Sequence, residues 1–254
     1  MEKIPIIINN FNLLTYPKEM VRALLDWDDV GEIFIVDNNS SYRPLLEWYN
    51  LIRSHKRINV LKCNSNFGHL APWAMELPKQ LTRQFKCRYF VVTDPDLDLS
   101  GCPIDTLTKM IDAYKTLPYG SYDYQARAGD PFEGAKILYR LKIGLGIRID
   151  DVPPDALFYT EMETRYYEQP MHGDLVRLAP VDTTFALYDS MYGVRAGIGG
   201  VRMEEPYQVR HLPYYFTGET LKQDYEYQNY LSTANYSSST KQRADGIGTT
   251  NISK

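Results

Sequence analysis

The stretch Tyr89-Phe90-Val91-Val92-Thr93-Asp94-Pro95-Asp96-Leu97-Asp98 joins an apolar, β-branched run to three acidic residues at alternate positions. Such a run favours a strand, and Pro95, which has no N–H to donate to a sheet, marks its end. Alternate side chains of an extended chain point to one side, so Asp94, Asp96 and Asp98 can present oxygen ligands to one divalent cation. Ligands of open α/β sheets bind at the carboxyl ends of strands, so we place the chemistry here.

Three more strands are predicted before this one, alternating with helices. Strand, helix, strand, helix is typical of an α/β domain with a mostly parallel central sheet and helices on both faces. Right-handed crossovers place the polar ends of the four strands on one edge, where they would line a cleft. The expected strands are residues 4–8, 32–36, 58–63 and 88–93, the helices 17–27, 43–53 and 72–85, and the polar ends Asn9-Asn10, Asp37-Asn38-Asn39, Asn64-Ser65-Asn66 and Asp94-Pro95-Asp96.

The later chain is less regular, but no boundary divides it from the first part. We expect one domain of two halves, residues 1–100 and 101–231, followed by a mobile tail at 232–254 that is rich in Ser, Thr, Asn and Gly. In the second half, helical spacing continues from residue 103 to 114, a polar loop covers 120–134, helical spacing returns at 156–169, and 178–188 is typical of a strand region.

Composition limits the classes of function. The 254 residues are 44% hydrophobic and 24% charged, as in globular proteins that bury a core. A formal net charge of −4 argues against a nucleic-acid partner. No apolar run has the length of a transmembrane segment, and the N-terminus lacks signal-peptide features. Cys63, Cys87 and Cys102 have no paired spacing, which indicates reduced thiols in a cytoplasmic protein.

Together these features resemble the nucleotide-sugar glycosyltransferases of the GT-A (Rossmann-like) fold, most closely the family 2 group with its bacterial and viral members. The resemblance covers roughly residues 4–215 and depends on the order of its segments. These segments are the opening strand, Val36-Asp37-Asn38-Asn39-Ser40, Asn64-Ser65-Asn66-Phe67-Gly68-His69, the Asp94-Pro95-Asp96 form of the DxD motif, residues 142–153, Val181-Asp182-Thr183-Thr184-Phe185 and Arg210-His211-Leu212-Pro213.

The resemblance implies a hexosyl- or deoxyhexosyltransferase of polysaccharide biosynthesis, which moves a sugar from a UDP-sugar donor to a glycan or other hydroxyl acceptor. Residues 1–100 would bind the nucleotide sugar and residues 101–231 the acceptor. Asp37 would contact the nucleobase, commonly uracil. Asn10 and Asn12 would line the same nucleotide pocket, and Asn66 would belong to the same edge.

The resemblance also implies a metal cofactor. Asp94 and Asp96 would hold Mn²⁺ or Mg²⁺ against the diphosphate of the donor. Two carboxylates offset the charge of the cation and leave positions open for phosphate oxygens. His211 matches a place where some members of the family supply a further metal ligand. The alternative for His211 is a side chain packed in the turn before Pro213.

An inverting transferase also needs a carboxylate as general base to deprotonate the acceptor hydroxyl. Three residues compete for this role: Glu161, Glu163 and Asp182. We place Glu161 and Glu163 ahead because the acceptor-side helix of the family usually carries the base. They lie two apart on a predicted helix, so both cannot face the cleft. Each of the three is alternatively a solvated surface carboxylate.

Other classes of protein use similar residues. A calcium-binding loop would place carboxylates at Asp94, Asp96 and Asp98, but it would need Gly where Leu99 stands and Glu where Asp105 stands. An aspartate-dependent phosphatase would use Asp96 as nucleophile and Asp98 as acid/base. The polar ends of the other three strands would then have no function. A nucleotidyltransferase would need a Gly-rich phosphate loop after the first strand, which this chain lacks.

Overall fold

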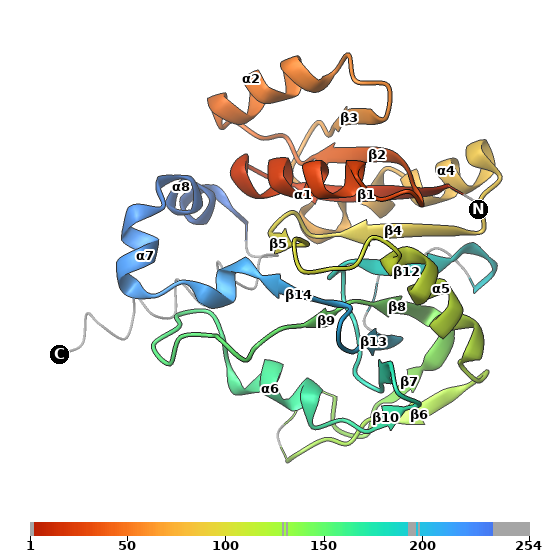
Figure 1. Ribbon diagram of the computed structural model, residues 1–254. Coiled ribbons are helices and arrows are strands. Elements are labelled where there is room, and N and C mark those ends of the chain that lie inside the picture. The colour runs from red at the N-terminus through yellow and green to blue at the C-terminus, as the bar shows by residue number, and fades with distance from the viewer. Residues whose placement is uncertain (1–2, 129, 131, 193–196, 198, 236–254) are drawn as a thin grey trace.

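The computed structural model describes residues 3–235, except residues 129, 131, 193–196 and 198 and the side chains of Glu161 and Met162. The chain forms a single mixed α/β unit around a large central sheet that carries helices on both faces (Figure 1). This is the fold class that the sequence predicts.

The first part of the chain alternates strands and helices as predicted. All four expected strands are present, and they form because their β-branched residues fill both faces of a buried sheet. The expected helix over 72–85 is broken, because Glu76 has a left-handed φ of 50° and a new helix begins at Leu77, with Pro78 in its first turn. The elements are β1 (Ile4–Asn10), α1 (Thr15–Leu25), β2 (Val30–Asp37), α2 (Arg43–Ile52), β3 (Ile58–Lys62), η1 (Gly68–Leu70), α3 (Ala71–Ala74), α4 (Leu77–Phe85) and β4 (Tyr89–Thr93).

The second part consists of short strands and helices. Its elements are β5 (Leu97–Asp98), α5 (Thr106–Thr116), β6 (Ser121–Asp123), β7 (Lys136–Leu138), η2 (Tyr139–Leu141), β8 (Lys142–Gly144), β9 (Gly146–Ile147), α6 (Glu161–Tyr167), β10 (Met171–His172), β11 (Val176–Arg177), β12 (Ala186–Asp189), η3 (Ser190–Tyr192), β13 (Val201–Met203), β14 (Gln208–His211), η4 (Leu212–Tyr215), α7 (Gly218–Gln223) and α8 (Tyr225–Thr233).

Both parts contribute to one sheet. Its strand order is β10-β11-β13-β8-β12-β4-β1-β2-β3. The strands β4, β1, β2 and β3 are parallel, and β12 joins them antiparallel to β4. A separate three-stranded sheet has the order β5-β14-β9, and β6 pairs with β7. Since β5 directly follows the acidic stretch, this small sheet brings β14 beside the end of β4 (Figure 1).

Alternating residues of β1 show how the two faces are covered. Ile6 and Ile8 belong to a core cluster with residues of α1, α2 and α5. Ile7 belongs to a second cluster with residues of α3 and α4. Successive side chains of a strand point to opposite faces, so the helices cover both faces of the parallel strands. The carboxyl ends of these strands remain at one edge.

Two predictions for the second part need correction. The helix expected over 156–169 covers only Glu161–Tyr167. The strand expected over 178–188 covers only Ala186–Asp189. Pro180 has no N–H for a ladder, and the carboxylate of Asp182 accepts from the backbone N–H of Thr184 at 3.1 Å, which stabilises a turn instead of a strand. The loop before β12 is therefore built by its polar residues.

The chain's last described helices return to its beginning. Leu13, Phe158, Phe216, Tyr227 and Leu231 form a third core cluster under α7 and α8. The helix α8 continues to Thr233, so it includes the first two residues of the expected tail. Residues 236–254 of that tail lie outside the described residues.

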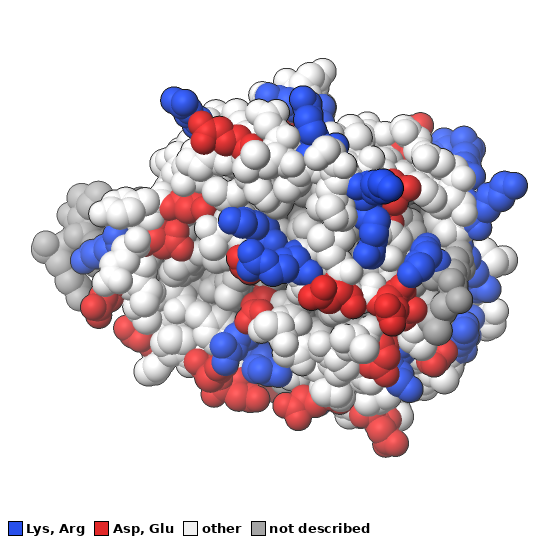
Figure 2. All heavy atoms as spheres, turned by 45° about the horizontal axis from the view of Figure 1, so that its top comes forward, with Lys and Arg blue, Asp and Glu red and all other residues white. Residues whose placement is uncertain are grey.

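Among the described residues, no helix has both the length and the apolar character needed to cross a membrane. Acidic and basic side chains are interspersed over the face shown in Figure 2. Cys63, Cys87 and Cys102 form no disulfide bond with one another.

Candidate functional site

Three segments that are distant in sequence meet at the carboxyl end of β4. Asp94 and Asp96 follow β4, Asp182 and Thr183 lie in the loop before β12, and His211 ends β14. The pairing of β14 with β5 aligns His211 with Leu97 and so brings its ring to Asp96. We call Asp94, Asp96, Asp182 and His211 the acidic cluster. The structure thus brings together four residues that the sequence singles out separately.

Asp96 and His211 are in direct contact within the acidic cluster. Nε2 of His211 lies 3.4 Å from Oδ1 of Asp96, and both side chains are largely buried. At that distance the contact is an ion pair at the limit of hydrogen-bonding range. Burial alone would lower the pKa of His211, but the carboxylates of Asp96, Asp94 and Asp182 outweigh it and raise that pKa. The ring also packs edge-on against Tyr214, with centroids 4.4 Å apart.

Asp94 is held by the loop before β12. Oγ1 of Thr183 donates a hydrogen bond to Oδ1 of Asp94 at 2.8 Å. Burial raises the pKa of Asp94 to about 7, and the negative charges of Asp182 and Asp96 add to the effect. A carboxyl group with this pKa marks a place where negative charge is in excess, and such places cluster at functional sites.

Asp182 is the accessible member of the acidic cluster, with 58% of its side chain exposed. Its Oδ1 accepts from the N–H and the hydroxyl of Thr184, at 3.1 and 2.8 Å, and lies 3.9 Å from the guanidinium of Arg202. Enclosure by neighbouring residues opposes ionisation, but Arg202 and Thr184 outweigh it and lower the pKa of Asp182 to about 2. Solvent screens part of this effect at so exposed a side chain, and the direction leaves Asp182 ionised at neutral pH.

Lys142 is a member of the site that the sequence reasoning missed. Its side chain is buried, and Nζ donates to the backbone carbonyls of Asp182 and Gly197 and, at 3.2 Å, to the hydroxyl of Tyr188. Burial lowers the pKa of Lys142 to about 8, against the opposing effect of Asp182. The sequence signal is a lysine flanked by Leu141 and Ile143, which suits a buried strand better than a solvated one.

The donor chemistry of the acidic cluster suits a hard divalent cation. Among the described residues, no three His, Cys, Asp or Glu side chains already surround a point where a metal ion would sit. Asp94 and Asp96 nevertheless offer two carboxylates, which suit Mn²⁺ and Mg²⁺, and His211 offers an imidazole, which suits a transition metal better than Mg²⁺. Oδ1 of Asp96 and Nδ1 of His211 are buried without a hydrogen-bond partner among the described residues. These atoms and the excess negative charge fit a cation.

The residues expected around a nucleobase lie at the carboxyl ends of β1 and β2 and are hydrogen-bonded within the protein, although Oδ1 of Asn10 is buried without a partner among the described residues. Asn10 and Asp37 are register partners at the ends of β1 and β2, and both are buried. The amide of Asn10 donates to the carbonyl of Leu13 and the hydroxyl of Tyr49, both at 2.8 Å. Oδ1 of Asp37 accepts from the N–H of Ser40 at 3.2 Å. Both side chains therefore brace the strand ends.

Asn12 and Asn66 also stabilise loops. Asn12 is buried, its Oδ1 accepts from the N–H groups of Ser41 and Tyr42, and its amide donates to Thr233 of α8 at 2.9 Å. Asn66 accepts from the N–H of Gly68 at 2.8 Å. The helix α8 therefore lies against the end of β1, which the sequence did not reveal.

Of the two glutamates predicted as a general base, Glu163 has a described side chain and Glu161 does not. Glu163 is buried and its Oε2 accepts from the N–H and the hydroxyl of Thr160, which closes the first turn of α6. The hydroxyl of Tyr214 approaches its Oε1 at 3.4 Å. Glu163 thus acts as a helix cap. The side chain of Glu161 lies outside the described residues.

Comparisons with known proteins find remote similarity. No protein-family model and no curated protein matches this chain. One similar solved structure is mannosyltransferase PcManGT from Pyrobaculum calidifontis in complex with GDP-Man and Mn2+, with 14% identity, 59% of this chain and 36% of that chain covered, and a TM-score of 0.38. Another is 4-diphosphocytidyl-2C-methyl-D-erythritol synthase, with 12% identity, coverages of 74% and 76%, and a TM-score of 0.38. The chain spans about a third of the length of the mannosyltransferase.

Proposed function

We propose that this protein is a metal-dependent glycosyltransferase, which moves a sugar from a nucleoside diphosphate sugar to a hydroxyl acceptor. The observation that carries the proposal is the convergence of Asp94, Asp96, Asp182 and His211 at the carboxyl end of β4. Asp96 and His211 come from distant segments, and their contact at 3.4 Å supports the proposal that both belong to one metal site. The resemblance of the sequence supplies the class of reaction.

Asp94, Asp96 and His211 are the residues that would hold Mn²⁺ or Mg²⁺. When bound, the cation supplies Lewis-acid stabilisation of the negative charge that develops on the leaving diphosphate. The other residues keep these ligands in place: Thr183 fixes Asp94 through its hydroxyl, and Tyr214 restricts the ring of His211. Ligands positioned by neighbouring side chains are the usual arrangement of a metal site.

Asp182 is the best-placed described candidate for the general base. It is exposed, ionised and adjacent to Asp94 through Thr183, whereas Glu163 closes a helix turn. In an inverting reaction its carboxylate would take the proton of the acceptor hydroxyl as the oxygen attacks the sugar carbon. A low pKa makes Asp182 a weak base, but the oxocarbenium-like sugar makes the attacking hydroxyl more acidic as the bond forms.

Recognition of a UDP base by Asp37 carries a structural requirement. Asp37 is only 1% exposed, so a nucleobase reaches it only if the surrounding loops open. The contact between Asn12 and Thr233 links the same strand end to α8. Binding of UDP at Asn10, Asn12 and Asp37 would therefore displace α8, whereas a donor held through its diphosphate alone would not.

The decisive experiment is a panel of UDP-, GDP- and CMP-sugars, screened for binding and for slow hydrolysis with Mn²⁺, with Mg²⁺ and with a chelator. We expect binding to at least one donor that requires the metal. Asp96→Ala should abolish metal-dependent binding while the circular dichroism spectrum stays unchanged. Absence of binding to every donor with either metal would contradict the proposal.

Asp98→Asn is the matched control and also separates the rival classes. The carboxylate of Asp98 accepts from the N–H of Ser100 at 2.9 Å, and it forms no ion pair with another described residue. We therefore expect Asp98→Asn to bind donors nearly as wild type does. A calcium-binding loop or an aspartate-dependent phosphatase would need Asp98, so an equal loss in both variants would favour those classes.

A further inference from the structure

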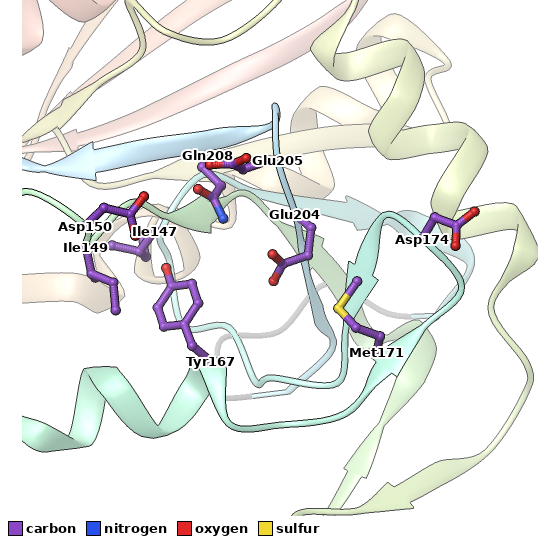
Figure 3. Close-up of a pocket in the computed structure, with 9 residues that line it drawn as sticks. All are labelled: Ile147, Ile149, Asp150, Tyr167, Met171, Asp174, Glu204, Glu205 and Gln208. Carbon is purple, nitrogen blue, oxygen red and sulfur yellow. The ribbon is translucent and has the colours of Figure 1, made fainter.

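A cavity of about 330 Å³ lies between α6, β9, β10 and β14. Figure 3 shows its lining side chains arranged around one space, with Asp174 at the far edge and pointing outward. The cavity is separate from the acidic cluster, because Gln208 and His211 lie three residues apart on β14 and point to opposite faces of the strand. Its lining residues are Ile147, Ile149, Asp150, Tyr167, Met171, Asp174, Glu204, Glu205 and Gln208.

The carboxylates of the cavity are only partly neutralised. Glu204 pairs with Arg177, whose Nε lies 2.5 Å from its Oε1. Asp150, Asp174 and Glu205 are exposed at the rim, and none of them has an ion pair or side-chain hydrogen bond with another described residue. The cavity therefore carries an uncompensated negative charge on several sides, as the spread of the labelled carboxylates in Figure 3 shows.

Gln208 gives the cavity a polar group that nothing in the described chain satisfies. Its side chain is 7% exposed, and its amide extends into the cavity (Figure 3). No hydrogen bond joins that amide to another described residue, and its nitrogen and oxygen remain open to the cavity. Gly146 faces it: a Cβ at Gly146 would lie 2.8 Å from Cγ of Gln208, so the glycine provides the room in which the amide lies. This is the arrangement of a binding site rather than of a packed core.

The rest of the lining is apolar. Ile147, Ile149, Met171 and the ring of Tyr167 form the walls. Such walls suit methylene groups, while the amide oxygen of Gln208 and the rim carboxylates suit N–H donors. A ligand that satisfies both parts has a short hydrocarbon chain and positively charged ends.

We infer that this cavity binds an aliphatic diamine or polyamine. A divalent metal ion is disfavoured because Asp150 and Asp174 lie on opposite sides of the cavity and do not meet at one point (Figure 3). Several separate carboxylates instead match several separate ammonium groups. Binding is independent of the transferase activity proposed above, although β14 carries both Gln208 and His211 and α6 borders both regions.

The test is calorimetric titration of the full chain at low ionic strength with spermidine and 1,8-diaminooctane. The neutral, equally long 1,8-octanediol and Mg²⁺ are titrated in parallel. We expect both amines to bind and neither octanediol nor Mg²⁺ to bind. The affinity for the amines should fall with added salt, which screens the charges. Failure of the transferase assay leaves this measurement unaffected, because it uses neither a nucleotide sugar nor a product.

Variants locate the binding. Asp150→Asn with Asp174→Asn should weaken diamine binding about fivefold or more, since each exposed ion pair contributes up to about fivefold. Gln208→Leu should weaken it further, because it removes an amide oxygen that can accept from an ammonium group. The control pair Asp26→Asn with Asp112→Asn removes the same charge from exposed positions elsewhere and should have little effect.

Three results would overturn the inference. The first is that neither amine binds, and the second is that octanediol binds as well as the diamine. The third is that the control substitutions at Asp26 and Asp112 weaken binding as much as those at Asp150 and Asp174. The last result would mean that the amines bind through the overall negative charge of the protein and not in this cavity.

Discussion

Thr183 and Asp94 are joined by a hydrogen bond of 2.8 Å, in which the threonine hydroxyl donates to the carboxylate. The bond links the loop before β12 to the end of β4 across 89 residues of chain. It fixes one candidate metal ligand and opposes the effects that raise the pKa of Asp94. The acidic cluster therefore depends on a residue type that does not itself bind metal.

Thr183→Val removes this donor while keeping the shape of the side chain. We expect Mn²⁺ to bind about fivefold more weakly, because a hydrogen bond to a ligand contributes on the order of 1 kcal/mol. Thr183→Ser keeps the hydroxyl and should bind Mn²⁺ nearly as wild type does. Titration followed by electron paramagnetic resonance of free Mn²⁺ measures both. Equal affinities of the valine variant and the wild type would show that Thr183 does not position Asp94.

The raised pKa of Asp94 predicts how stability depends on pH without metal. The pKa of Asp94 is about 7 in the folded protein, against ~3.9 in the unfolded chain. Between these values the folded state binds more protons, so this residue's contribution to stability falls as pH rises from about 4 to about 7. His211, whose pKa is also raised, contributes stability below about 6.5 that is lost as pH rises through its folded pKa.

Asp94→Asn isolates the contribution of that carboxyl group. Relative to wild type, the metal-free variant should gain stability steadily from pH 4 to pH 7 in urea denaturation. At pH 8, Mn²⁺ should stabilise the wild type but not Asp94→Asn, since a cation replaces the missing proton. A difference between the two proteins that stays constant across this range would contradict the raised pKa.

The sequence predicts the parallel half of the sheet well because its signals are local. Each strand from β1 to β4 is a short apolar run that stops at Asn or Asp, and the apolar period alone places it. The strand expected over 178–188 fails because Asp182 and Thr184 bond to each other and hold a turn. A β-like composition does not reveal which hydroxyl groups will compete with the ladder.

The site was predictable only in part, for a physical reason. Asp94 and Asp96 are adjacent to a strand end, so local pattern finds them. Asn12 looks like a pocket residue, but its amide bonds to Thr233, a contact 221 residues away that no pattern shows. Lys142 is the opposite case, because it belongs to the site but was not predicted. A lysine is ordinarily exposed, and only the fold surrounds this one with hydrogen-bond acceptors.

Lys142→Met tests whether that buried ammonium group organises the loop before β12. The substitution leaves the carbonyls of Asp182 and Gly197 without their donor, so we expect a loss of about 2–4 kcal/mol in the free energy of unfolding. Donor binding should weaken as well, because Asp182 and Thr183 lose their support. The control is Lys136→Met. The ammonium group of Lys136 pairs with Asp123 at the surface, so its loss should change the free energy of unfolding little. Equal stability of the two variants in urea would contradict a role for Lys142.

Glu226 of α8 supplies the cap that α1 lacks. The side chain of the N-cap residue Leu14 forms no hydrogen bond with the first turn of α1. Instead the carboxylate of Glu226 accepts from the N–H groups of Leu14 and Thr15, at 2.7 and 2.8 Å, and from the hydroxyl of Thr15 at 2.9 Å. A negative charge at a helix N-terminus is favourable, and these three bonds anchor α8 at the same time.

Glu226→Gln keeps the size of this side chain and removes its charge. We expect the free energy of unfolding to fall by about 1 kcal/mol, since caps of this kind contribute on that order. The amide protons of Leu14 and Thr15 should exchange faster with deuterium, because α8 no longer holds them closed. Glu47→Gln is the control: Glu47 forms an exposed pair with Arg43 at 2.8 Å, and its loss should leave those two amides unchanged. Unaltered exchange in Glu226→Gln would mean that α8 is anchored by the aromatic cluster around Tyr227 instead of by this carboxylate.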